Sequence, residues 1–382
     1  MNVKTFLSII TLFSLGLISV IGVSAAPSAL PPQEEWNKTF GGSRDEIFTS
    51  VQQTSDGGFV VAGITQSFGD GSSNAWLVKT DSSGNEEWNR TFGGPLEDEA
   101  QAVKQTYDGG YILVGRTSSY GTSKDLWLIK TDPSGNEEWN KTVPGFQFEV
   151  LRSLILTEDE EYIFVGEVGD QRYSDLLLVK TDTSGDEEWN KTLGGTVGEY
   201  SHSVYQLTDG YIIAGHKCSS ETSCDAWLKE MDLEGNETWN KTYGGKDFDA
   251  VASVHQTGDG GYVIAGFTRS YGEGRNDMWV IKTNSSGGEE WNKTIGEIMD
   301  DAATSVQQTT DGGYIVAGFK TSVFEGKKNV DAMLIKLSPA LPQNTSTPDL
   351  TPSPEPVGTA GFKGLLAITG LVAGAYLLRR GV

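Results

Sequence analysis

Six carboxylates recur at one place in a repeating sequence, and they are the residues best suited to chemistry. Each lies five residues before an apolar position, and the set is Glu46, Asp98, Glu149, Glu199, Asp249 and Asp301. As a ring around one mouth of a folded body they could hold a hard cation such as Ca²⁺, which prefers oxygen ligands. As local structure, each acid would accept hydrogen bonds from loop N–H groups. Their presence in every copy favours the structural role, because a reactive site needs residues that differ from one copy to the next. We expect no cofactor, and calcium is the one cation that the ring would suit.

A second polar set recurs where a later strand of each copy is expected to begin. It comprises Asn74, Asp125, Asp175, Asp225, Asp277 and Asp331. Asn and Asp at such a place are typical of turn caps. The turn from Asp81 to Asn85 faintly resembles a calcium loop, but it lacks the alternating acids and the glutamate at position 12. A hairpin turn with glycine at positive φ explains it better.

No group of residues in the sequence resembles a catalytic constellation. His202, His216 and His255 do not occupy equivalent repeat positions, and no G-x-S-x-G or H-E-x-x-H string occurs. Cys218 and Cys224 have neither C-x-x-C spacing nor a histidine cluster beside them in the sequence. In an exported chain such a pair is expected to form a local disulfide. We therefore predict no catalytic residue.

The charge balance narrows the class of partner. The 382-residue chain has 29 Lys and Arg against 52 Asp and Glu, a net charge of −23. A field of this sign repels phosphate backbones, so nucleic acid is not expected as a partner. The 48 glycines and five methionines favour turns over helices.

An internal repeat supplies the elements that must position these side chains. A W-N-[KR]-T string recurs every 50 to 52 residues, at Trp36, Trp88, Trp139, Trp189, Trp239 and Trp291. Each copy divides into four short apolar or alternating runs separated by Gly- and Asp-rich turns, which predicts four strands and no helix. In the first full copy we label them A (50–54), B (58–65), C (75–80) and D (86–92). A period near 50 with four strands favours a six-bladed β-propeller of antiparallel blades over residues 34–338. Its tryptophans are expected to pack between blades.

The register of the copies predicts how the ring closes. The chain begins with a lone strand D (35–40) and ends with strands A, B and C (305–309, 313–318 and 332–337) but no D. The N-terminal strand would then complete the last blade and remove the free sheet edge. The Asp-Gly-Gly start of strand B and the C–D hairpin ending in Trp resemble quinoprotein-type and kelch-like propeller repeats. That resemblance implies the fold, and it does not extend to the adjacent-cysteine disulfide of the quinoprotein enzymes.

The two ends of the chain predict its location. Lys4, an apolar run and the small residues before position 27 are typical of a signal peptide over residues 1–26. Residues 339–360, rich in Pro, Ser and Thr, favour an extended stalk. Residues 361–382 contain Gly361-Phe362, an apolar segment and Arg379-Arg380, and they predict a hydrophobic anchor or sorting signal. This tail resembles the archaeal PGF-CTERM signal, which implies removal by an archaeosortase and attachment to a surface lipid. Ala360 stands where that motif has proline.

Nine N-x-[ST] sequons predict N-glycosylation of an exported chain. They are Asn37, Asn89, Asn140, Asn190, Asn236, Asn240, Asn284, Asn292 and Asn344. Six of them lie on strand D, the expected outer edge of each blade, where a glycan would shield that edge.

Variable loops indicate where recognition would occur. Loops D–A and B–C share one face, the B–C loops vary in length, and aromatic residues occur in them: Phe68, Tyr120, Tyr173, Tyr271 and Phe324. We therefore expect a non-enzymatic binding or cell-envelope protein at the cell surface, with a glycan, protein or other surface component as ligand. The alternative is an extracellular propeller enzyme that acts on polysaccharide. Leu154-Ile155-Leu156 replaces the Val-Gln-Gln string in the third copy, so the channel should be most apolar there.

Overall fold

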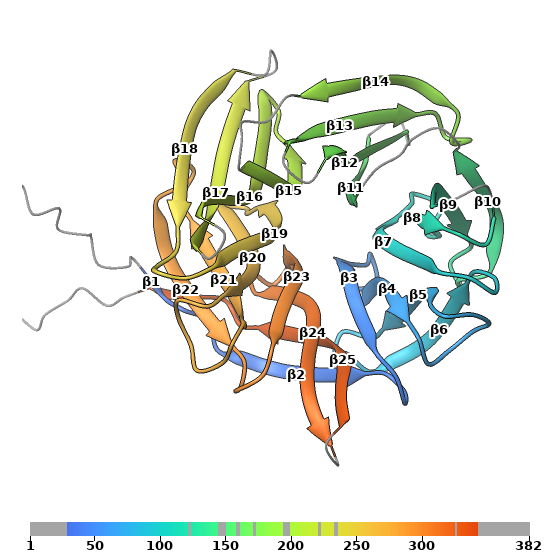
Figure 1. Ribbon diagram of the computed structural model, residues 1–382, viewed down its shortest axis with the longest axis horizontal. Helices are drawn as coiled ribbons and strands as arrows, with labels where there is room; N and C mark the ends of the chain where they lie inside the picture. Colours follow the sequence, from blue (N-terminus) through green and yellow to red (C-terminus); the bar gives the residue numbers. More distant parts are fainter. Residues whose placement is uncertain are drawn as a thin grey trace, which may run out of the picture. The chain divides into compact units, whose positions relative to one another are not determined.

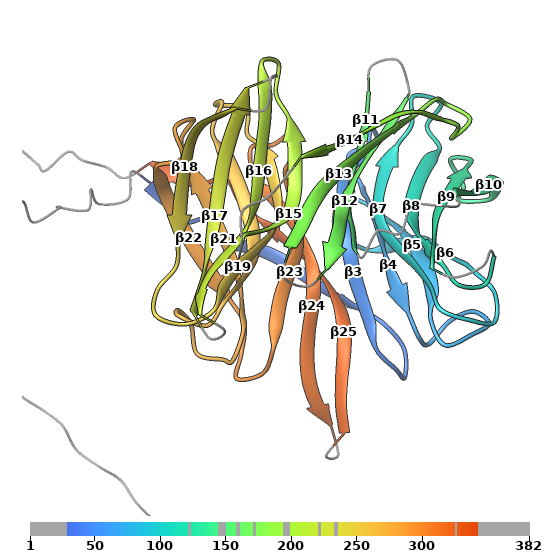
Figure 2. The same cartoon turned by 45° about the horizontal axis from the view of Figure 1, so that its top comes forward.

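The computed structural model describes residues 29–342, except 121–123, 144–149, 158–160, 171–172, 194–198, 221–222, 233–235 and 325–326. Every element in this part is a strand, and the strands form six four-stranded antiparallel sheets and one two-stranded sheet. The six sheets stand as blades around a common axis (Figure 1). Figure 2 shows the same ring tilted, with the hairpin of β24 and β25 projecting from it. The predicted all-β, six-bladed propeller is confirmed.

The strands of the first three blades follow chain order from the axis outward. Blade one holds β3 (Glu46–Gln53), β4 (Phe59–Thr65), β5 (Asn74–Thr80) and β6 (Glu86–Phe92). Blade two holds β7 (Asp98–Gln105), β8 (Tyr111–Thr117), β9 (Asp125–Thr131) and β10 (Glu137–Val143). Blade three holds β11 (Val150–Leu156), β12 (Tyr162–Asp170), β13 (Tyr173–Thr181) and β14 (Glu187–Leu193).

The remaining blades repeat this order, and the sixth takes its outer strand from the N-terminus. Blade four holds β15 (Glu199–Gln206), β16 (Gly210–Ser220), β17 (Ser223–Asp232) and β18 (Glu237–Tyr243). Blade five holds β19 (Asp249–Gln256), β20 (Tyr262–Thr268), β21 (Asp277–Thr283) and β22 (Glu289–Ile295). Blade six holds β23 (Asp301–Gln308), β24 (Tyr314–Phe324), β25 (Lys327–Leu337) and β2 (Glu34–Phe40). The two-stranded sheet pairs β1 (Ala29–Leu30) with β26 (Leu341–Pro342).

Burial explains the order of strands within a blade. The two middle strands of blade one, β4 and β5, are almost wholly buried because they are continuous apolar runs covered on both faces. The outer strand β6 has the sequence EEWNRTF and is exposed over its first two residues. The tryptophans of strand C, such as Trp76 and Trp127, are buried between blades. On strand D, Trp36, Trp88 and Trp291 pack edge-on against an aromatic residue of the next blade, as Trp88 does on Tyr111 with 5.8 Å between ring centroids.

Five of the six described inner strands begin at the recurrent acid, which in β3 is four residues earlier than predicted, and all six contain a bulge. In β3 the pairing register shifts between Phe48 and Ser50, which leaves Thr49 as an extra residue. The Thr49 hydroxyl donates to Ala62 O at 3.1 Å and to Ala100 O of the next blade at 2.9 Å. A Cβ at Gly63, opposite this bulge, would lie 2.1 Å from Ile47 O, so only glycine fits there. The bulge therefore requires glycine at the facing position of strand B, and it places a hydroxyl that bonds to the next blade.

The ring closes as predicted. Strand β2 pairs antiparallel with β25 from Glu34 opposite Leu337 to Phe40 opposite Ala332. Beyond the predicted limits of 34–338, Ser338 N donates to Gln33 O at 2.8 Å, and β1 pairs with β26. The folded body therefore spans residues 29–342 and is longer at both ends than the predicted 34–338.

Membrane insertion through a helix finds no support in the part of the chain that the structure describes, because none of its elements is a long apolar helix. The predicted signal peptide, most of the stalk, the sequon at Asn344 and the C-terminal segment lie outside the described residues. Location, glycosylation and tail processing therefore stay predictions.

Candidate functional site

The recurrent acids that the structure describes are buried, and each accepts hydrogen bonds that hold loops together. We call such a carboxylate an acid clasp. The Glu46 carboxylate, fully buried, accepts hydrogen bonds from Gly42 N at 2.8 Å, Ser67 N at 2.9 Å and the Thr65 hydroxyl at 3.1 Å. It thereby joins the D–A loop before β3 to the B–C loop after β4. This geometry supports the structural interpretation of the set, because the lone pairs are used by backbone and hydroxyl donors. The hypothesis that the ring holds a cation stays a prediction.

Three other acids of the set make the same kind of clasp. Asp98 accepts from Gly94 N at 2.7 Å and from the Ser119 hydroxyl at 2.6 Å, and Asp249 accepts from Gly245 N at 2.8 Å. Asp301 accepts from the backbone N–H groups of Glu297 and Thr321. Burial opposes ionisation of Asp98, but hydrogen bonds from the Ser119 and Thr117 hydroxyls outweigh it and lower the pKa of the carboxyl. Glu149 and the side chain of Glu199 lie outside the described residues.

The second polar set lies against the first at the blade junctions. A Cβ added at Gly244 would lie 2.7 Å from Asp225 Oδ1 and 2.8 Å from Asp249 Oδ2, so the two carboxylates flank this glycine. Burial and the charge of Asp249 together raise the pKa of Asp225. Asp331 with Glu46 and Asp277 with Asp301 repeat the arrangement, whereas Asn74 takes the place of the acid beside Asp98. Asn74 and Asp277 begin their strands, whereas Asp225 and Asp331 lie inside longer ones. The acids of this set form pairs across the junctions, which the turn-cap interpretation did not include. The side chain of Asp175 is outside the described residues.

The aromatic residues of the variable loops have structural partners. Tyr120 donates to Gly93 O at 2.9 Å and packs on Trp127, and Tyr271 donates to Gly244 O at 2.7 Å. Phe68 packs on Trp76 with 5.8 Å between ring centroids. Phe68, Tyr120 and Tyr271 nevertheless remain 39%, 43% and 45% exposed, so their availability for recognition stays a prediction. Each ring packs on the strand-C tryptophan of its own blade. The side chains of Tyr173 and Phe324 are not described.

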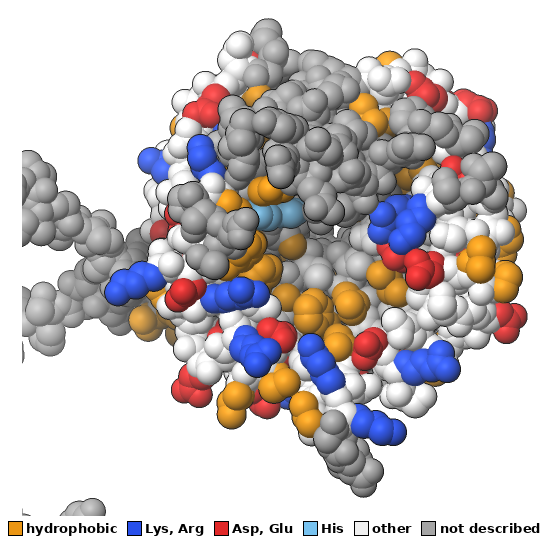
Figure 3. All heavy atoms as spheres, viewed as in Figure 1, with side chains coloured by type: hydrophobic (Ala, Val, Ile, Leu, Met, Phe, Trp, Pro, Cys, Tyr) orange, Lys and Arg blue, Asp and Glu red, His pale blue; other side chains and the backbone are white. Residues whose placement is uncertain are grey.

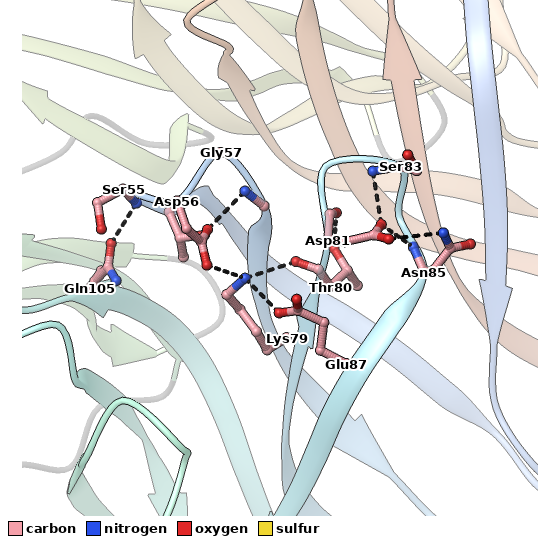
Figure 4. Close-up of polar contacts among 12 residues, drawn as sticks. Ser55, Asp56, Gly57, Lys79, Thr80, Asp81, Ser83, Asn85, Glu87 and Gln105 are labelled. Atoms are coloured by element: carbon pink, nitrogen blue, oxygen red, sulfur yellow. Dashed lines mark hydrogen bonds and ion pairs between the residues drawn. The ribbon is translucent and has the colours of Figure 1, made fainter.

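A charged cluster at the opposite ends of the strands was missed by sequence reasoning. The buried Lys79 ammonium lies 2.9 Å from Asp56, 3.0 Å from Glu87 and 2.9 Å from Thr80 O (Figure 4). Lys130, Lys282 and Lys336 make the same contacts in blades two, five and six. The signal was present in the recurring Asp-Gly-Gly, Lys-Thr and Glu-Glu-Trp strings, but only strand pairing brings the three together. In blade four Glu230 replaces the lysine and accepts from the Thr238 and Tyr262 hydroxyls.

The predicted disulfide is confirmed, but its surroundings differ from the expectation. Cys218 and Cys224 are cross-strand partners near the end of the β16–β17 hairpin, with Cα atoms 3.9 Å apart. His216 lies beside them, and its Nδ1 is 2.7 Å from Nε2 of His202. The expectation of no nearby histidine cluster is therefore wrong, because strand pairing joins residues that are 14 apart in sequence. Both sulfurs are held in the disulfide, so no thiolate is available to a metal.

A cavity of about 1070 Å³ lies along the axis of the ring. Most of its lining comes from the second halves of the inner strands and from the A–B turns, on the face opposite to the acid clasps. Ile163, Lys180 and Trp189 of blade three and Tyr211 of blade four also line it. Figure 3 shows the other face of the ring, that of the D–A and B–C loops, where histidine and hydrophobic side chains lie beside the middle. Leu154, Ile155 and Leu156 line one wall, where the sequence predicts the most apolar part of the channel.

One repeat position supplies a half-buried side chain to the cavity from every blade. In blade order the six residues are Gln52, Lys104, Ile155, Tyr205, His255 and Gln307. We call them the channel ring. The serine two residues before the channel-ring position links neighbouring blades. Ser50, Ser253 and Ser305 each accept a hydrogen bond from an inner-strand N–H of the next blade. The channel ring is thus chemically asymmetric on a symmetric scaffold.

The titratable members of the channel ring influence each other. His255 Nδ1 lies 2.7 Å from Gln256 O, and burial together with the charge of Lys104 lowers the pKa of His255 to about 4. Burial also lowers the pKa of Lys104. Tyr205 packs edge-on against His255 with 4.9 Å between ring centroids. The channel ring therefore offers the Lys104 amine, a neutral imidazole, a phenol and two carboxamides.

Comparisons with known proteins found solved structures of low similarity. No family model matches the chain, and no curated protein matches it. Among solved structures, a subtype N10 neuraminidase-like protein of A/little yellow-shouldered bat/Guatemala is 9% identical, with a TM-score of 0.46 over 82% of this chain and 99% of that one. A subtype N11 neuraminidase-like protein of A/flat-faced bat/Peru is 10% identical, with a TM-score of 0.48 over 82% and 97%. Such values carry no argument about function. The class that the strand order defines is the six-bladed β-propeller.

Proposed function

We propose that this propeller is a non-enzymatic binding protein whose ligand occupies the axial cavity. The channel ring carries the proposal. The clasps, glycines, tryptophans and serines repeat from blade to blade because they hold the fold. At the channel ring, by contrast, six equivalent positions carry five different side chains. Concave sites with a few convergent polar groups are where small ligands bind.

The lining chemistry supports binding over catalysis. A glycosidase needs two carboxyl groups on either side of the bond that it cleaves, roughly 5 to 9.5 Å apart. Among the described lining residues Glu161 is the one carboxylate, and it forms an ion pair with Lys180 at 2.5 Å. The other acids described above are engaged by loop donors or lysines at the two ends of the blades. The described lining of the cavity therefore lacks the pair of carboxyl groups that a polysaccharide-cleaving enzyme would need.

The proposal keeps the location that the sequence predicts. Export would use residues 1–26, and residues 361–382 would hold the protein at the cell surface, where a glycan or another surface component is the expected ligand. Membrane fractionation with N-terminal sequencing tests this part. A mature chain beginning at Pro27 in the membrane fraction supports it, and a chain retaining Met1 in the soluble fraction contradicts it.

A ligand array read with paired variants tests the site. The double variant Gln52→Tyr/Gln307→Tyr places in blades one and six the side chain that blade four carries at the same position, so it narrows the cavity. Val323→Ser, at an exposed hydrophobic position of the β24–β25 hairpin, is the control. We expect the full-length protein and the control to bind the same ligand and the double variant to lose it. Equal binding by all three would overturn the axial site.

A further inference from the structure

We propose that the axial cavity selects an acidic saccharide and that Lys104 binds its carboxylate. The inference rests on the proposed function and names the class of ligand for that site.

Lys104 differs from the lysines at the ends of strand C. Lys79, Lys130, Lys282 and Lys336 each lie against two carboxylates. Lys104 points into the cavity and has no ion pair or hydrogen bond with any described residue. Holding an ammonium away from bulk water without a counter-ion is costly, and an anion that enters the cavity removes this cost.

The charge of the cavity is opposite to that of the molecule. The chain carries −23 overall, whereas the described lining residues comprise Lys104, Lys180 and Glu161, a net charge of +1 with His255 neutral. Lys180 is already paired with Glu161 and Glu188. An entering anion would therefore meet one unpaired positive charge, which suits a single carboxylate. The lining contains no arginine among the described residues, so the paired contacts that favour phosphate are not offered there.

The remaining ring chemistry suits a sugar. Gln52 and Gln307 each use the side-chain oxygen to accept an N–H of the next blade, from Gln105 at 2.7 Å and from Gln53 at 2.8 Å. Each carboxamide NH₂ is left as a donor at the cavity wall. The opposite side of the ring carries Ile155 and Tyr205, an apolar wall with an aromatic face.

A pyranose has a hydroxyl edge and an apolar C–H face, so these two walls match its two sides. The volume of about 1070 Å³ is at the upper end of small-molecule sites, which leaves room for more than one sugar unit.

Matched ligands and a matched variant test the inference. The ligands are short oligosaccharides of uronic acids and the same oligosaccharides after reduction of each carboxyl to an alcohol. The variant is Lys104→Gln, which places at blade two the residue that blades one and six carry, so it should fold. Binding is measured by calorimetry with the full-length protein. We expect at least about tenfold tighter binding of one acidic member than of its reduced form, and loss of that preference in Lys104→Gln.

The outcomes separate this inference from the proposed function. Equal affinity for acidic and reduced forms, or a preference that survives Lys104→Gln, overturns the role of Lys104. If the reduced forms bind and Gln52→Tyr/Gln307→Tyr abolishes that binding, the cavity is still the site and only the charge selection is wrong. If no saccharide of either form binds, the ligand class is wrong, and the wider array then decides whether the cavity binds anything. Melting temperatures of Lys104→Gln and the parent should agree within a few degrees or favour the variant.

Discussion

His255 lies in the wall of the cavity as a neutral imidazole, and this gives it a distinct effect on acid stability. Burial, followed by the nearby charge of Lys104, lowers the pKa of His255 from 6.5 to about 4. Because the unfolded chain binds this proton more readily, stability is lost as the pH falls from about 6.5 towards 4. We expect the parent to lose about 3 kcal/mol more than His255→Gln across that window. Urea unfolding at stepped pH measures it, and parallel curves for the two proteins would contradict it.

The acid pair at the junction of blades four and five predicts a stabilising substitution. Burial and Asp249 raise the pKa of Asp225, so the ionised carboxylate is disfavoured in the folded state. The junction of blades one and two has Asn74 at this position. We therefore expect Asp225→Asn to raise the melting temperature at pH 7, by the equivalent of about 0.5–1 kcal/mol.

Melting temperatures measured at low pH check the Asp225→Asn prediction. The advantage of the variant should shrink at low pH, where Asp225 is protonated in both states. The reverse change, Asn74→Asp, should destabilise the protein at pH 7. A melting temperature that falls in Asp225→Asn would show that the negative charge at this position is needed.

At the scale of the strand, each lysine clamp connects three elements at one end of its blade. Lys282 joins the A–B turn through Asp259, its own strand through Thr283 O and strand D through Glu290. The Lys282 side chain is 3% exposed, whereas those of Asp259 and Glu290 are 60% and 29% exposed. Solvent therefore weakens each pair, but loss of the ammonium leaves Thr283 O without this donor and two acids side by side.

We expect Lys282→Met to destabilise the protein by about 2 kcal/mol, because one buried charge holds several partners. Lys246→Met, at an exposed lysine of the same blade, should change stability by less than about 0.5 kcal/mol. Chemical denaturation of both variants measures the difference. A Lys282→Met variant as stable as Lys246→Met would show that the clamp is only a surface ion pair.

The strands themselves could be predicted from the sequence, but the side chains of the cavity could not. Alternation assigns faces to a strand only while the register is regular. The bulge at Thr49 inserts one residue into β3, and the register shift recurs in the other inner strands, so the residue that faces the axis cannot be counted from the strand end. For that reason Gln52 in its Val-Gln-Gln string and Lys104 in the equivalent Val-Lys-Gln string gave no sign of a cavity. The clamps were missed for a similar reason, since Asp56, Lys79 and Glu87 meet only through strand pairing.

At the scale of the molecule, stability depends on the pairing of β2 with β25. This pairing satisfies the outer edge of blade six and packs Phe40 and Trp36 against the blade-six and blade-one core. We expect deletion of residues 34–41 to lower the melting temperature by more than 10 °C, because one blade loses a strand and the ring loses its closure. The contacts of β1 are few, so deletion of residues 29–32 should lower it far less. Calorimetry compares the two, and equal melting temperatures would mean that closure contributes nothing.

The same pairing constrains when the protein can finish folding during synthesis. Gln33 and Ser338, which are hydrogen-bonded beside β2 and β25, are 305 residues apart in the chain. At roughly 5–20 residues per second, the partner of the first strand is made about 15–60 seconds later. Until then the first strand waits unpaired, and blades can form while the ring remains open. A chain that ends before β25 therefore leaves β24 with a free edge and β2 without a partner, so a truncated product lacks the closed ring.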